Sequence, residues 1–190
     1  MWRAGDTASG YYPRPVGSFY TQVLVRADAQ RCVDVMRSLR RPSYVIPPHR
    51  GITVVCDKQC EGQDMETLDS VAATLGARLE VPTAALLNHD DDWLVFRLFE
   101  RGRFVGGIEV GHTPLSLRGS VAKLREIVSP GAPLWPIYAA LLKPRLFQLQ
   151  RHAELVAALG LPQGSLGVGY QYIARNDVSV FLDRATVLET

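Results

Sequence analysis

The sequence predicts an α+β fold, with a mixed β-sheet, helices packed on one face of it, and a helical segment towards the C-terminus. Three observations predict it. Short runs of β-branched and aromatic residues alternate with amphipathic helical stripes over residues 18–112. The stretch 113–160 has the helical spacing alone. The hydrophobic share of 47% is ordinary for a globular protein, and 190 residues can bury one core.

The chain is expected to form a single domain over 18–190, preceded by a flexible arm over 1–17. Glycine and proline recur in that first stretch and its apolar residues are scattered, so it lacks the apolar run of a signal peptide. Within the domain we expect three parts. They are a sheet-rich part over 18–112, a helical part over 113–160 and C-terminal strands over 161–190.

The sheet-rich part combines strand patterns with two helices. Asp28 and Asp64 precede the two helical stripes, and an aspartate in that position accepts the free amide protons of the first turn. The stripe after Asp64 is the more apolar, with Leu68, Leu75 and Leu79 on one side. The expected strands are 19–26, 43–46, 51–57 and 82–87, followed by a hairpin of 93–99 and 104–110.

The helical part begins after Pro114. Pro133 stands at the start of one helix, and Gly160 ends the last of them, because glycine tolerates the left-handed conformation of a helix cap. The expected helices are 117–128, 134–142 and 146–159. After them, 167–173 and 178–182 are expected to form a final pair of strands.

Four short motifs stand at turns and helix ends. They are Gln63-Asp64, Asp90-Asp91-Asp92, Leu98-Phe99-Glu100-Arg101-Gly102, and the segment from His152 to Tyr172. Together they resemble a pattern in an uncharacterised family of bacterial proteins, a domain of unknown function, over about half the chain. The resemblance implies a fold of this class and no catalytic residues. Cys60-Glu61-Gly62 departs from the pattern, which has a serine there.

Composition limits the classes of function. The net charge of +2 produces no field strong enough to indicate a nucleic-acid partner or an acidic membrane surface. No run of 18 apolar residues is present, so no membrane span is expected. Three cysteines cannot form a complete disulfide framework, which favours a reducing compartment. These features predict a cytoplasmic protein.

The densest cluster of ligand-type side chains is His89-Asp90-Asp91-Asp92. If strands 51–57 and 82–87 are parallel and joined by a right-handed crossover, their carboxyl ends meet at one edge of the sheet. Carboxylates beside an imidazole suit a divalent metal ion. The predicted ligands at this edge are Asp57, Asp64, His89, Asp90 and Asp92. The alternative is that the aspartates simply form a tight turn between two apolar strands.

Two classes of function remain open. The sequence contains no nucleophile elbow, phosphate-binding loop, zinc-protease motif or kinase signature. Their absence favours a non-catalytic binding or regulatory module without a cofactor, whose partner is another protein held by the sheet and its appended helices. The alternative is a metal-assisted hydrolase that uses the carboxylates at the sheet edge.

Overall fold

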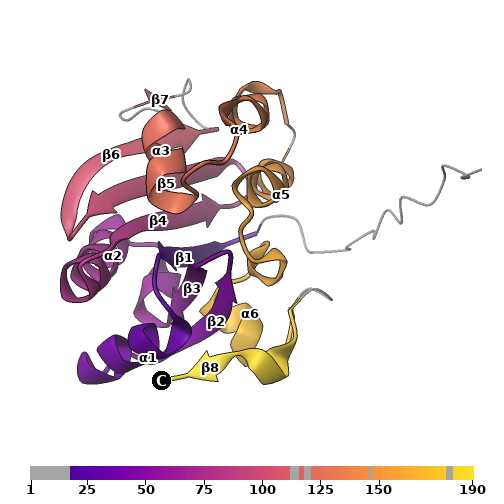
Figure 1. Ribbon diagram of the computed structural model, residues 1–190. Coiled ribbons are helices and arrows are strands. Elements are labelled where there is room, and N and C mark those ends of the chain that lie inside the picture. The colour runs from indigo at the N-terminus through magenta and orange to yellow at the C-terminus, as the bar shows by residue number, and fades with distance from the viewer. Residues whose placement is uncertain (1–17, 112–115, 118–120, 146, 179–181) are drawn as a thin grey trace, which may run out of the picture.

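The computed structural model describes residues 18–111, 116–117, 121–145, 147–178 and 182–190 (Figure 1). The predicted arm over 1–17 lies outside these ranges, as does most of the last predicted strand. The described residues form one β-sheet covered by helices, which confirms the α+β class. None of the described helices is long and apolar enough to cross a membrane.

The sheet of the described residues has eight strands in the order β7-β6-β5-β4-β1-β3-β2-β8. The strands are β1 (Tyr20–Val25), β2 (Ser43–His49), β3 (Ile52–Asp57), β4 (Pro82–His89), β5 (Trp93–Glu100), β6 (Arg103–Val110), β7 (Ser116–Leu117) and β8 (Leu188–Glu189). All neighbouring pairs are antiparallel, so the predicted mixed sheet is wrong. The reason lies in β1. Strands β3 and β4 run in the same direction, as expected, but β1 lies between them and is antiparallel to both.

The first six elements form the centre of the fold. They are β1, α1 (Ala29–Ser38), β2, β3, α2 (Met65–Leu79) and β4, a β-α-β-β-α-β order in which β1 splits the β3-α2-β4 unit. This is the connectivity of the ferredoxin-like motif. The hairpin of β5 and β6 then extends the sheet beyond β4, as the sequence predicted.

Both helices of this centre begin where the sequence predicted. The carboxylate of Asp28 accepts the amide of Arg31 at 2.9 Å, and that of Asp64 accepts the amide of Thr67 at the same distance. Each bond satisfies a backbone donor that has no partner inside the helix. The caps therefore fix the first residues of α1 and α2.

Helices cover both faces of the sheet, so the prediction of helices on one face is wrong (Figure 1). One face packs against α1 and α2. The opposite face packs against α3 (Val121–Val128), α4 (Leu134–Leu142), α5 (Gln148–Leu159) and α6 (Tyr170–Ala174). The physical reason is visible in β1, whose six residues are all buried. A strand that is buried on both sides needs a cover on both sides.

The C-terminal part differs from the prediction of paired strands. Residues 170–174 form the short helix α6, so the predicted strand over 167–173 is wrong. The carboxylate of Glu61 accepts a hydrogen bond from the amide of Tyr170 at 2.5 Å, and this amide, at the first residue of α6, has no partner inside the helix. Strand β8 does pair with β2, through Tyr44 and Val45. The short 3-10 helices are η1 (Gln59–Gly62), η2 (Gln163–Ser165) and η3 (Arg184–Thr186).

Candidate functional site

The predicted metal site lies at the edge of the sheet where β3 and β4 end and β1 begins. Asp57 is the last residue of β3, and His89 is the last residue of β4. Both do lie at this edge, as the sequence predicted. However, β1 stands between the two strands, and neighbouring strands are about 4.8 Å apart. Asp57 and His89 are therefore separated by about two strand spacings, roughly 10 Å.

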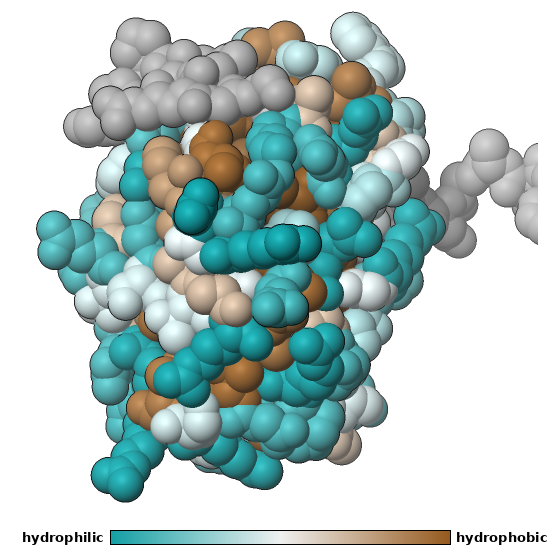
Figure 2. Space-filling view, turned by 60° about the vertical axis from the view of Figure 1, so that its left-hand side comes forward, coloured by the Kyte–Doolittle hydropathy of each residue, from teal (hydrophilic) through white to brown (hydrophobic). Residues whose placement is uncertain are grey.

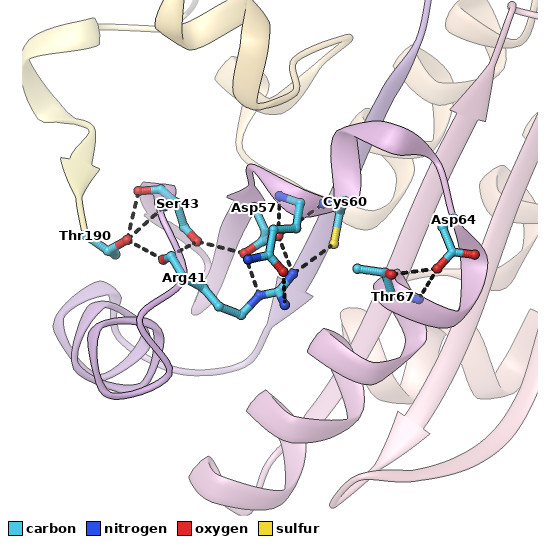
Figure 3. A network of polar contacts seen from close by, with 8 residues as sticks. Arg41, Ser43, Asp57, Cys60, Asp64, Thr67 and Thr190 are labelled. Atoms are coloured by element: carbon cyan, nitrogen blue, oxygen red, sulfur yellow. Dashed lines mark hydrogen bonds and ion pairs between the residues drawn. The ribbon is translucent and has the colours of Figure 1, made fainter.

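Asp57 is buried in a network of its own, shown in Figure 3. Arg41 donates to both of its carboxylate oxygens, with Nε 2.8 Å from Oδ2 and Nη2 2.6 Å from Oδ1. The backbone amides of Gln59 and Cys60 donate to Oδ1 at 2.9 and 3.1 Å, and the hydroxyl of Ser43 donates to Oδ2. The hydrogen bond to Asp57 raises the pKa of Arg41. Asp57 therefore holds the junction of β2, β3 and η1.

The same network holds the end of the chain. The hydroxyl of Thr190 donates to the carbonyl of Arg41 at 2.8 Å and accepts the amide of Ser43 at 2.8 Å. The amide of Thr190 donates in turn to the carbonyl of Ser43 (Figure 3). These bonds position β8 on the outer edge of β2. The role of this network is structural.

Asp64 and His89 have other partners. Asp64 is exposed and accepts both the amide and the hydroxyl of Thr67, and the hydroxyl bond is the main reason that its pKa is lowered. The Nδ1 atom of His89 lies 2.5 Å from Oε1 of Gln63, and its ring meets the edge of Phe19 at 5.1 Å. Neither residue turns towards Asp57.

The aspartates that follow β4 form a tight turn, as the alternative prediction stated. Asp90 and Asp91 have φ angles of 52° and 56°, a left-handed conformation that aspartate tolerates better than most residues. Asp90 and Asp92 are exposed. Asp91 is buried instead and accepts from the side chains of Ser18 and Asn88. In the described part of the chain, no three His, Cys, Asp or Glu side chains are grouped as a metal site would require.

The first feature that the sequence did not reveal is a buried polar pair between β1 and α5. The hydroxyl of Tyr20 lies 2.8 Å from Nδ1 of His152 on α5, and the two rings stack at 5.6 Å. His152 is completely buried, which lowers the pKa of its imidazole to about 3. Its Nε2 atom has no hydrogen-bond partner among the described residues. The imidazole is therefore neutral, and its role is to join α5 to the sheet.

An apolar surface on α4 is the second feature that the sequence did not reveal. Trp135 is 76% exposed and Leu142 is 62% exposed, and Phe147, the residue that precedes α5, is 49% exposed. Trp135 and Leu142 are called the α4 surface below. The opposite side of the helix is buried, through Ile137, Ala140 and Leu141. A helix that is apolar all round is normally buried on every side, so the exposure of one side of α4 is unusual.

The surroundings of α2 and β6 are different in character. Figure 2 brings forward the left-hand side of Figure 1, where these elements lie, and shows mainly hydrophilic side chains with apolar atoms in small, separate areas. Single exposed apolar side chains of this kind are normal on a protein surface. The α4 surface is unusual because Trp135 and Leu142 are both largely exposed on one short helix that carries no charged residue.

Comparison with protein-family models, curated proteins and solved structures finds no match for the chain. The resemblance of its turn motifs to a bacterial family therefore stays a prediction. Function has to be inferred from the geometry of the described residues. The α4 surface is the feature of that geometry that indicates binding most directly.

Proposed function

We propose that this chain is a non-catalytic binding module that binds protein through the α4 surface, and that the protein it binds is a second copy of the same chain. The observation that carries the proposal is the 76% exposure of Trp135 beside the exposed Leu142. Tryptophan has the largest apolar surface of any side chain, and it is strongly enriched at the centres of protein interfaces.

The arrangement of side chains along α4 favours a second copy. Trp135, Ala139 and Leu142 are spaced i, i+4 and i+7, so they share one side of the helix. Two such helices that pack antiparallel about a twofold axis place Trp135 against Leu142 of the partner subunit. The small Ala139 then lies beside the axis, where the two backbones approach most closely. A patch that is large at both ends and small in the middle is complementary to itself.

Charge favours the same partner. Helix α4 has no charged side chain along its length, so pairing it with its own copy buries no charge. A partner with a charged face would lose the hydration of that charge without gaining an ion pair from α4. An apolar helix face is therefore the surface that fits it best.

The size of the patch sets the expected strength. Aromatic side chains each bury about 150–250 Å². With the exposed fractions of Trp135 and Leu142, each subunit contributes roughly 300 Å² of side-chain surface. This is less than half of the area of about 800 Å² per partner in a standard interface. We therefore expect a weak dimer whose population depends on protein concentration.

Sedimentation velocity tests the proposal. The wild-type sedimentation coefficient should rise from that of a monomer to that of a dimer between micromolar and submillimolar concentrations. Trp135→Ser and Leu142→Ser should remain monomeric, because each removes one half of the proposed contact. Leu188→Ser is the matched control, since Leu188 is also exposed but lies on β8. A wild type that is monomeric throughout, or variants that associate as it does, would contradict the proposal.

The metal-assisted hydrolase is not proposed. It would need the predicted carboxylates around one ion, whereas Asp57 uses both of its oxygens on Arg41 and on backbone amides. Asp64 caps a helix, and His89 contacts Gln63. Of the two functions, binding is therefore the one that the described residues support better.

A further inference from the structure

A pocket of about 300 Å³ lies between the end of β3 and helix α6. It is independent of the α4 surface, because no residue of α4 lines it. The lining residues are Lys58, Glu61, Tyr170, Gln171, Ala174 and Arg175. Its volume is at the lower limit of the range typical of small-molecule sites, which suits a compact ligand.

Two cations face this pocket from different elements. Lys58 follows β3, and Arg175 follows α6. Both are exposed, and neither forms an ion pair with any residue that the structure describes. Among the described residues Arg175 donates to the neutral side chain of Gln171, at 3.0 Å, and its charge also lowers the pKa of Glu61 without a direct ion pair. Positive charge in the pocket is therefore available to a ligand.

The single carboxylate of the lining is already in use. Oε1 of Glu61 accepts the amide of Tyr170 at 2.5 Å, and the amide of Gln171 donates to the same carboxylate. Burial raises the pKa of Glu61, and these two amides act in the opposite direction. Glu61 thus holds α6 in place. Two positive charges remain against one partly buried negative charge.

Tyr170 is the aromatic residue of the lining, and its ring is held in place by a stack. It stacks on Tyr44 with ring centroids 4.7 Å apart. The guanidinium of Arg184 covers the ring of Tyr44 in turn, 4.6 Å from its centroid. Because Tyr44 is buried and lies on β2, the sheet fixes the position of the whole stack. Aromatic rings held in this way act as platforms for planar ligands.

We infer that this pocket binds a small phosphate monoester attached to a flat ring, with the phosphate between Lys58 and Arg175 and the ring on Tyr170. A phosphate monoester carries about 1.5 to 2 negative charges near neutral pH and has three acceptor oxygens, so it can contact Lys58 and Arg175 at once. Arginine is well suited to the role, because its planar guanidinium can donate two parallel hydrogen bonds to phosphate.

Isothermal titration calorimetry of the full chain tests the inference with three probes. Adenosine monophosphate carries both parts, inorganic phosphate carries the charge alone, and adenosine carries the ring alone. Adenosine monophosphate should bind with the highest affinity of the three, and its affinity should fall as salt rises. The inference is wrong if neither adenosine monophosphate nor inorganic phosphate binds. Equal affinity for these two would overturn the part assigned to Tyr170.

Charge variants locate the site. Lys58→Gln and Arg175→Gln should each weaken the binding of adenosine monophosphate about tenfold, the usual scale for a lost charge-assisted hydrogen bond. Glu61→Gln should strengthen it, since it removes the negative charge while its Oε1 can still accept the amide of Tyr170. Arg26→Gln is the matched control, because Arg26 is exposed and distant from the lining residues. If Arg26→Gln weakens binding as much as Arg175→Gln does, the phosphate does not bind in this pocket.

Discussion

His152 should make the protein sensitive to acid well before most carboxylates are protonated. In the folded chain its imidazole is completely buried against Tyr20, and burial lowers its pKa from 6.5 to about 3. In the unfolded chain the imidazole is hydrated and titrates normally. Between these two values the unfolded state binds one more proton than the folded state. The stability that depends on neutral His152 is thus fully present above about pH 6.5 and is lost as the pH falls towards 3.

The expected loss follows from the size of the pKa difference. Each unit of difference corresponds to about 1.4 kcal/mol, so the full change is roughly 5 kcal/mol. At pH 5 the loss relative to neutral pH should be about 2 kcal/mol, from this residue alone. That is a large share of the 5–15 kcal/mol by which domains are typically stable.

The assay is urea denaturation followed by circular dichroism at several values between pH 7.5 and 5. His152→Asn keeps an acceptor for the hydroxyl of Tyr20 but does not titrate in this range. It should be less stable at neutral pH, because it leaves a cavity, and it should lose stability less steeply with acid than the wild type. His49→Asn, at an exposed position, should follow the wild-type slope. Equal slopes for wild type and His152→Asn would refute the reasoning.

Three further changes test other parts of the structure, each by urea denaturation. Asp57→Asn should cost about 3 kcal/mol or more, because it leaves Arg41 without its buried partner. Leu75→Ala should cost on the order of 2–5 kcal/mol, since Leu75 is fully buried between α2 and the sheet. Glu61→Gln should become more stable relative to wild type as the pH rises from 4 to 7. Burial raises the pKa of Glu61, so the folded wild type loses stability as this carboxyl group ionises, whereas glutamine does not ionise.

Each of these has an outcome that would contradict it. A loss below about 0.5 kcal/mol in Leu75→Ala would mean that α2 presents another side to the core. An Asp57→Asn variant as stable as wild type would mean that the ion pair contributes little. For Glu61, the reasoning fails if the difference between variant and wild type does not change with pH.

Local features of the fold could be predicted from the sequence. The caps at Asp28 and Asp64, the hairpin of β5 and β6, and the left-handed end at Gly160 depend on residues only a few positions apart. For such features the physical cause lies within one short segment of the chain. The same reasoning identified the Asp90-Asp91 turn as the alternative to a metal site, and the structure contains that turn.

The order of the strands could not be predicted in the same way. Placing β1 between β3 and β4 depends on contacts across the whole sheet, and no local pattern encodes it. That one placement removes the parallel pair and separates Asp57 from His89. The pairing of Asp57 with Arg41 was equally hidden, because the two residues meet only once β2 and β3 are side by side.

The exposed side of α4 was hidden for a different reason. Its sequence, LWPIYAALL, is apolar on every side, as in a helix that is buried all round. Such a sequence does not indicate which side of the helix is exposed. Which side faces the sheet depends on the packing of α5 and α3. The lack of any charged residue among these nine was nevertheless a signal that the side of α4 facing away from the core could contact another apolar surface.

The geometry of the proposed dimer is tested most directly by a disulfide across its axis. Ala139→Cys places one thiol beside the twofold axis, where the two Cα atoms should come within the 4.4–6.8 Å that a disulfide spans. The native residues Cys32, Cys56 and Cys60 are buried, so they should not compete. Mild oxidation should therefore convert Ala139→Cys to a covalent dimer, whereas Ala77→Cys, exposed on α2, should remain largely monomeric. Equal cross-linking of the two variants would contradict the pairing of α4 with its own copy.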